Sequence, residues 1–142
     1  MPKQLPVFVY GTLLSGFHND SGYIKPFPHT KTRATIKGEI YHLPEGYPGL
    51  LMTDAGEVAG EIVDFAPEVY EKALAGLDEL ETYYGEGDSR NEYERIPVTA
   101  CVRETGQEVE VYVYRYLDEA YVKRVGTRVE HGDWRAFMER AE

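Results

Sequence analysis

The hydrophobic and polar residues follow short periods that predict several β-strands. Residues 5–10 (LPVFVY) are almost continuously apolar, which is typical of a short strand that is buried on both faces. In residues 108–116 (EVEVYVYRY) valines and tyrosines alternate, so the valines face one way and the tyrosines the other. Three further segments are expected to be strands: 34–43, 57–65 and 94–102.

Two segments have the spacing of helices. Residues 67–81 place Pro67 at the first helical position, where a proline is tolerated, and residues 133–141 place their apolar side chains at helical spacing. Many short strands with few helices predict an α+β fold, a small mixed β-barrel-like curved sheet with flanking helices. Such a barrel leaves one mouth open as a ligand cavity.

Glycines and prolines predict irregular chain between these elements. The segments that we expect to be loops are 14–31, 44–50 and 83–92. Neither an internal repeat nor a linker is visible, and a chain of 142 residues is ordinary for one domain. We therefore expect a single domain over residues 1–142.

The composition narrows the choice of partners and compartment. The formal net charge is −10, from 25 acidic and 15 basic residues, which opposes binding to nucleic acids and anionic membranes. The apolar runs are too short to span a membrane, and the first four residues leave no room for a signal peptide before the first strand. Cys101 lies in a strand-like alternation, where we expect it to be in the core. A single cysteine favours a reducing compartment, so we expect a cytoplasmic protein.

Glu81 is the most informative candidate for chemistry. Tyr70, Leu74 and Leu77 form an apolar stripe on one helix face, and the next position of that stripe is Glu81. A carboxylate near the core loses hydration, so its pKa rises and it becomes a suitable general base near neutral pH. The alternative is a frayed helix end with Glu81 in water. Asp78 and Glu79 are expected to be ordinary solvated acids.

Gly11 marks the end of the first strand. A glycine there permits either a tight turn or a close approach of the backbone to a ligand. Other chemistries lack their motifs: there is no phosphate-binding Lys-Ser/Thr, no Gly-x-Ser-x-Gly, and no metal-ligand spacing among the histidines. Those histidines are His18, His29, His42 and His131. We therefore expect no metal and no cofactor.

The chain resembles the γ-glutamylcyclotransferase-like family, including its AIG2-like members, over nearly its whole length. The resemblance begins at FVYGTL (8–13) and is carried by the helix-end LDELE (77–81). The other matching motifs are 34–43, YPGL (47–50), 58–65, YER (93–95), VYVYRY (111–116) and HGDW (131–134). It implies a small mixed barrel and an enzyme in which the α-amine of a γ-glutamyl substrate attacks the γ-carbonyl, releasing 5-oxoproline and an amine.

The resemblance also implies roles for individual residues. A loop would hold the glutamyl group through backbone N–H groups, and Glu81 would be the general base. The residues of that loop are Tyr10, Gly11, Thr12 and Leu13. Tyr114 is a further candidate for the wall of the site. Arg95 is either a residue of the cavity wall or part of a structural ion pair.

Two other classes of function remain open from the sequence. One is a non-catalytic small-molecule binding domain, in which Glu81 is only a ligand contact. The other is a structural domain that docks a partner through its acidic surface. The glutamate at the helix end favours the enzyme, because a binding domain has no particular need of a base there.

Overall fold

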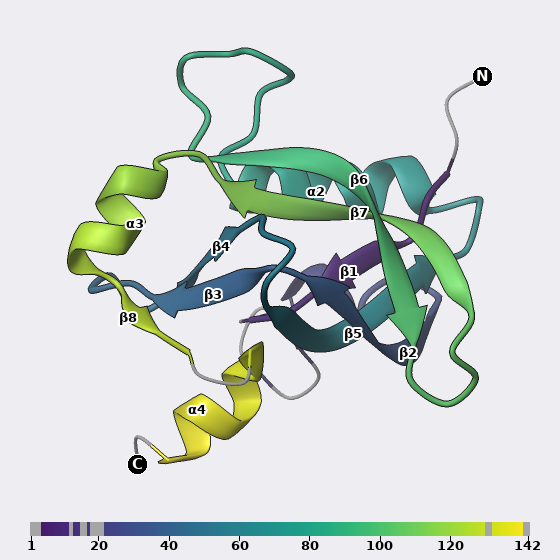
Figure 1. Ribbon diagram of the computed structural model, residues 1–142. Coiled ribbons are helices and arrows are strands. Elements are labelled where there is room, and N and C mark those ends of the chain that lie inside the picture. Colours follow the sequence, from purple (N-terminus) through teal and green to yellow (C-terminus); the bar gives the residue numbers. More distant parts are fainter. Residues whose placement is uncertain (1–3, 12, 15–16, 18–21, 130–131, 141–142) are drawn as a thin grey trace.

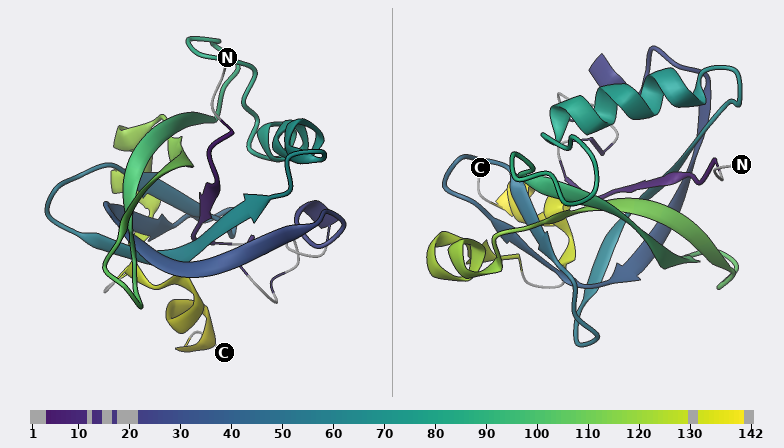
Figure 2. Two further views of the ribbon diagram at one scale, coloured as in Figure 1. Left: turned by 90° about the vertical axis from the view of Figure 1, so that its right-hand side faces the viewer. Right: turned by 90° about the horizontal axis from the view of Figure 1, so that it is seen from above.

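The protein is described by a computed structural model, in which five strands close into a barrel (Figure 1). The structure describes all residues except 1–3, 12, 15–16, 18–21, 130–131 and 141–142. Around the barrel the strands are ordered β1, β5, β2, β6 and β7, with β7 returning parallel to β1. Their bounds are Val7–Val9 for β1, His29–Lys37 for β2, Glu57–Phe65 for β5, Tyr93–Val102 for β6 and Glu108–Tyr116 for β7. The predicted α+β barrel with flanking helices is confirmed, and Figure 2 shows the strands wrapping around a closed interior.

A second, three-stranded sheet lies beside the barrel, in the order β4, β3 and β8. Its strands are Glu39–His42 (β3), Pro48–Leu51 (β4) and Thr127–Arg128 (β8). The predicted strand 34–43 is therefore wrong as one element, because it is divided at Gly38 between β2 and β3. The Gly38 N–H donates to the Gly56 carbonyl at 3.0 Å, which holds the chain where it leaves the barrel. The predicted loop 44–50 was also wrong at its end, since Pro48 begins β4.

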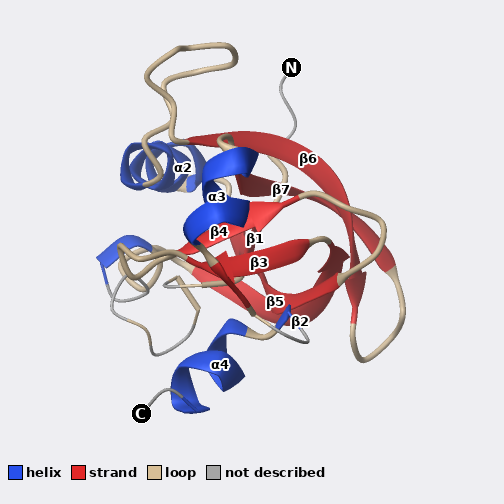
Figure 3. Cartoon of the chain, turned by 60° about the vertical axis from the view of Figure 1, so that its left-hand side comes forward, coloured by secondary structure: helices blue, strands red, loops and turns tan. Residues whose placement is uncertain are grey.

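The helices occupy different sides of the strands (Figure 3). Helix α2 (Tyr70–Leu80) connects β5 to β6, and it buries Tyr70, Ala73 and Leu77. Its first residue is also anchored by a side chain, because the Tyr70 hydroxyl donates to the Leu5 carbonyl at 2.6 Å. Helices α3 (Glu119–Val125) and α4 (Trp134–Arg140) follow β7. None of the described helices is long and apolar enough to cross a membrane.

The core joins side chains from both sheets and from all three of these helices. The strand β7 is buried on both faces, since Val111 and Val113 are fully buried on one and Tyr114 and Tyr116 are buried on the other. The expectation that Cys101 of β6 lies in the core is wrong. Cys101 is exposed, and its neighbour Ala100 is the buried residue. The strand β2 begins at His29, inside the segment 14–31 that was expected to be irregular.

Candidate active site

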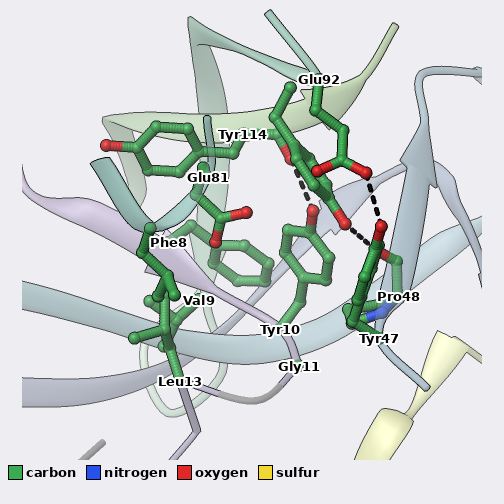
Figure 4. Close-up of a pocket in the computed structure, with 12 residues that line it drawn as sticks. Phe8, Val9, Tyr10, Gly11, Leu13, Tyr47, Pro48, Glu81, Glu92 and Tyr114 are labelled. Atoms are coloured by element: carbon green, nitrogen blue, oxygen red, sulfur yellow. Dashed lines mark hydrogen bonds between the residues drawn. The ribbon is translucent and has the colours of Figure 1, made fainter. Parts of the chain in front are cut away.

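A cavity of about 100 Å³ opens where the end of β1, the start of β4 and the end of α2 meet (Figure 4). A cavity of this volume accommodates only a small chemical group. Its wall is largely apolar and aromatic, with only a few polar side chains. The lining residues are Phe8, Val9, Tyr10, Gly11, Leu13, Tyr47, Pro48, Leu80, Glu81, Glu92, Tyr93 and Tyr114. Of the six sequence-predicted site residues, the cavity brings together five. The sixth, Thr12, lies outside the described residues.

Glu81 stands at the C-terminal end of α2, and the way in which the helix ends fixes its position. The Thr82 N–H donates to the Glu79 carbonyl at 3.2 Å, and the Tyr83 N–H donates to the Asp78 carbonyl at 2.9 Å. This pair of bonds is a Schellman motif, which requires a left-handed residue after the cap. Thr82 takes that conformation, with φ of 55°. Glu81 is therefore held at the last position of the helical stripe, and Figure 4 shows its carboxylate inside the cavity.

The Glu81 carboxylate lacks a counter-ion in the part of the chain that the structure describes. None of the hydrogen bonds and ion pairs found among the described residues involves its oxygens. Burial raises the pKa of Glu81 to about 8, and the negative charge of Glu92 adds to this effect. A carboxyl group with this pKa is shared between its acid and base forms near neutral pH, so it can both accept and return a proton.

Asp78, one turn before Glu81, has a different environment from the solvated one that the sequence suggested. It accepts hydrogen bonds from Arg95 Nη1, at 2.5 and 2.7 Å, and from the Tyr114 hydroxyl at 2.6 Å. The expectation of an ordinary solvated acid is therefore wrong for Asp78, whereas Glu79 is exposed. Of the two roles left open for Arg95, the structure has the ion pair. The Arg95 charge is thus directed to Asp78 rather than to Glu81.

Tyr114 contributes its ring and backbone to the cavity wall, while its hydroxyl points away toward Asp78 (Figure 4). Its carbonyl accepts a hydrogen bond from the Tyr10 hydroxyl at 2.5 Å. Burial raises the pKa of Tyr10 well above its ordinary value, and Glu81 adds to the effect, so the hydroxyl stays protonated as a donor. Tyr10 therefore ties the end of β1 to its neighbour β7 in the wall of the cavity.

Packing within the protein requires a glycine at position 11. A Cβ atom at this position would lie 2.4 Å from Pro48 Cγ, so the close approach is between β1 and β4. The loop then turns, with the Leu14 N–H donating to the Gly11 carbonyl at 3.0 Å. The backbone hydrogen bonds found between described loop residues include none donated by the N–H groups of Gly11 and Leu13.

Three polar residues of the wall were missed by the sequence reasoning: Tyr47, Glu92 and Tyr93. The Tyr47 hydroxyl donates to Glu92 Oε2 at 2.5 Å, and the Tyr93 hydroxyl donates to the Pro48 carbonyl. Tyr47 and Glu92 stood in segments expected to be loops, where no periodicity indicates which way a side chain points. The only signal was that Tyr47 and Tyr93 begin motifs that carry the family resemblance.

Comparison with known proteins assigns the chain to a family. Residues 7–136 match the model of the γ-glutamyl cyclotransferase, AIG2-like family, so the chain belongs to that family. A γ-L-glutamyl-butirosin B γ-glutamyl cyclotransferase of Niallia circulans is 36% identical over 131 residues, which cover 92% of this chain and 76% of that protein.

Solved structures agree with this assignment. The crystal structure of an AIG2-like protein from mouse superposes with a TM-score of 0.63 and 26% identity, covering 81% of this chain and 80% of that one. A solution structure from Arabidopsis thaliana has a TM-score of 0.67 at 23% identity, covering 99% and 78%, and shows likeness of fold alone. The predicted family and fold are therefore confirmed.

Proposed function

We propose that this protein is a γ-glutamylcyclotransferase that converts a γ-glutamyl amine or γ-glutamyl amino acid into 5-oxoproline and a free amine, with Glu81 as the general base. The observation that carries the proposal is the Glu81 carboxylate, which lies in the cavity without a counter-ion among the described residues and has a pKa raised to about 8. A site that only binds a ligand has no need of a side chain that titrates near neutral pH, because a group of fixed charge or a neutral group binds equally well. A carboxyl group that titrates near neutral pH is suited to proton transfer.

The reaction demands little beyond this proton transfer. Glu81 takes a proton from the α-ammonium group of the substrate, and the freed amine attacks the γ-carbonyl carbon of the same molecule. A carbon–nitrogen bond forms to close the five-membered ring, and the amide bond to the leaving nitrogen breaks. Glu81 returns its proton to that leaving nitrogen, so the carboxylate is regenerated. The new ring nitrogen then loses its second proton through the same carboxylate to the released amine, which leaves as its ammonium ion. Holding the substrate folded supplies the proximity that the attack needs.

The loop at the end of β1 is assigned to the glutamyl group. We assign the N–H groups of Gly11 and Leu13 as its donors, because they donate to none of the described loop carbonyls. The family resemblance adds Thr12 to this set. Backbone donors of this kind typically stabilise a developing oxyanion by about 3 kcal/mol. Tyr10 and Tyr114 form the adjoining part of the cavity wall, where the Tyr10 hydroxyl donates to the Tyr114 carbonyl.

The relatives support a γ-glutamyl substrate but leave the leaving amine open. The Niallia circulans relative is named for γ-L-glutamyl-butirosin B, and its identity to this chain is 36%. Such conjugates share the γ-glutamyl group and differ in the amine, which agrees with a small cavity that accepts one end of the substrate.

A substrate panel tests the proposal directly. We expect purified protein to release 5-oxoproline from at least one member of a panel of γ-glutamyl amines, γ-glutamyl amino acids and glutathione, measured by chromatography. Binding of these compounds without release of 5-oxoproline would contradict the proposal and point to the non-catalytic binding domain. Absence of both binding and turnover would point instead to a partner-docking role.

A further inference from the structure

A second cleft, with a volume of about 460 Å³, lies on the outer face of the barrel. Its wall is largely polar and shares no described residue with the cavity that holds Glu81. The lining residues are Leu14, Arg33, Ala59, Gly60, Glu61, Arg103, Asp133 and Arg135. Strand β1 lies on the other side of β5 from this cleft, because a Cβ atom at Gly60 would meet the Val9 carbonyl oxygen at 2.2 Å. The cleft is therefore a separate site.

Strand pairing places two arginines side by side in this cleft. Ala34 of β2 pairs with Val102 of β6, and the next residues continue this register, since the Arg103 N–H donates to the Arg33 carbonyl at 3.0 Å. Residues opposite each other on neighbouring strands point to the same face of a sheet. Ala34 is fully buried, so Arg33 and Arg103 both project from the outer face, where they are exposed.

This arrangement is electrostatically unfavourable, because like charges opposite each other on neighbouring strands repel. Glu61 of β5 is opposite Arg33 in the register, but none of the ion pairs found among the described residues joins it to either arginine. Glu61 takes part in another interaction, and Asp133 accepts from the Ala136 N–H at 3.1 Å. Among the described residues the two guanidinium groups therefore lack a carboxylate partner, although the formal net charge of the chain is −10.

A third guanidinium group reaches the cleft from a helix. Arg135 belongs to the first turn of α4, which lies outside the barrel, below β5 in Figure 1. Its Cζ atom is 5.0 Å from the centroid of the Phe17 ring, a contact that helps to hold the side chain in place. Arginines thus enter the cleft from three places in the fold: from β2, from the residue after β6 and from α4.

Three guanidinium groups suit a phosphate group better than a carboxylate. Both anions accept the paired hydrogen bonds that a guanidinium group donates. A carboxylate has two oxygens and one charge, whereas a phosphate monoester has three terminal oxygens and a charge near −2 at neutral pH. The cleft is larger than a phosphate ion, so it has room for the molecule that carries the group. Glu61 and Asp133 are placed in the wall to accept from hydroxyl groups of that molecule.

We propose that this cleft binds the phosphate group of a small phosphorylated molecule, with Arg33 and Arg103 as the principal contacts and Arg135 as a third. The bound phosphate supplies the negative charge that the two opposed arginines lack among the described residues. The inference is independent of the proposed function, because it uses none of the residues that line the catalytic cavity.

Titration of the purified protein with two phosphate probes tests the inference. The probes are inorganic phosphate and glycerol 3-phosphate, followed by calorimetry at an ionic strength held constant with chloride, and glycerol is the probe without phosphate. We expect one saturable site for each phosphate probe with Kd of about 1 mM or below, as for two or three charge-assisted hydrogen bonds, and no binding of glycerol. Absence of saturable binding would overturn the inference. Binding of inorganic phosphate alone would also overturn it, because it would show an ion site and not a site for a phosphorylated molecule.

Arg33→Gln and Arg103→Gln assign the binding to this cleft. Each removes one charge from an exposed position, so we expect folded proteins whose melting temperature without phosphate is equal to that of the wild type or higher. Binding of glycerol 3-phosphate should weaken at least about tenfold in each variant. Arg90→Gln, at an exposed arginine outside the cleft, is the matched control and should keep the wild-type Kd. An unchanged Kd in the two cleft variants would overturn the inference, and so would an equal loss in Arg90→Gln, which would show attraction by net charge alone.

The outcomes separate the two proposals. Both cleft variants should keep the wild-type kcat/KM for 5-oxoproline release, because neither arginine lines the catalytic cavity. Phosphate binding by a protein that releases 5-oxoproline from no member of the substrate panel would overturn the proposed function and support this inference. Turnover without phosphate binding would do the reverse.

Discussion

Arg95 of β6 forms an ion pair with Asp78, with 2.5 Å between Nη1 and Oδ2. Asp78 belongs to α2, the same helix that ends at Glu81. The guanidinium group also lies over the rings of Tyr83 and Tyr112, 5.3 and 4.9 Å from their centroids, which helps to hold it in place. A direct pair with Glu81 would have lowered the pKa of that group. The helix therefore carries two acids with different environments: Asp78 is neutralised by Arg95, and Glu81 is left to titrate.

Arg95→Met tests whether this ion pair is structural. The substitution keeps the apolar stem over the tyrosine rings but leaves the half-buried Asp78 without its cation. We expect a loss of about 1–3 kcal/mol in the free energy of unfolding and a kcat within about threefold of the wild type. Arg90→Met, which removes an exposed ion pair with Asp88, is the control and should barely change the melting temperature. A large loss of kcat in a stable Arg95→Met protein would make Arg95 part of the catalytic machinery.

Burial of Glu81 predicts how stability depends on pH. The pKa is about 8 in the folded protein against 4.5 for the free side chain. Between these values the folded state binds more protons at this position than the unfolded state, so the stability contributed by Glu81 is full below pH 4.5 and is lost as the pH rises through 8. The advantage of Glu81→Gln in free energy of unfolding should therefore grow over this range, to about a few kcal/mol. Denaturant titrations at pH 5 and pH 8 measure it, and a constant difference would contradict a buried carboxylate.

The same group predicts the pH dependence of the rate. Only the ionised form of Glu81 can accept a proton, so kcat/KM should fall as the pH drops below about 8. Glu92→Gln removes a negative charge near Glu81 and lowers its pKa, so the acidic limb of the profile should move to lower pH for every substrate. Profiles of wild type and variant with one substrate check this, because the titration of the substrate is common to both. Superimposable limbs would show that the two carboxylates do not interact.

The contact between Gly11 and Pro48 predicts a cost in stability for any side chain at position 11. Pro48 is paired with His42 in the second sheet, so it has little freedom to retreat from a new Cβ atom. We expect Gly11→Ala to lower the free energy of unfolding by about 1–3 kcal/mol. Gly22→Ala is the matched control, since nothing lies within 4 Å of the added carbon. Equal melting temperatures for the two variants would mean that β1 and β4 are not held in contact.

The sequence predicted the regular elements well where periodicity is strong. The strands 57–65 and 108–116 have the predicted bounds, and the helices at 70–80 and 134–140 lie within the predicted segments. The stripe that ends at Glu81 predicted a position near the core, because i, i+4 and i+7 positions share a helix face, and the structure has this residue in the lining of the cavity. The family resemblance added the loop at the end of β1, four of whose residues it named and three of which are described in the cavity.

The failures of prediction have physical causes of two kinds. Short strands such as β4 and β8 are held by their pairing with β3, which no local pattern reveals. The environments of Asp78, Cys101 and Glu92 depend on which residues the barrel brings beside them. Arg95 is 17 positions from Asp78 and Tyr47 is 45 positions from Glu92, so these contacts follow from the fold and not from spacing along the chain.

Replacement of Glu81 by glutamine is the most direct test of the account, with kcat for 5-oxoproline release from the best γ-glutamyl substrate as the measurement. The amide keeps the size of the side chain but cannot accept the proton, so kcat should fall by about a hundredfold or more while binding changes less. Glu79→Gln, on the exposed face of the same helix, should keep wild-type turnover. Wild-type turnover in a folded Glu81→Gln protein would contradict the assignment of Glu81 as the general base.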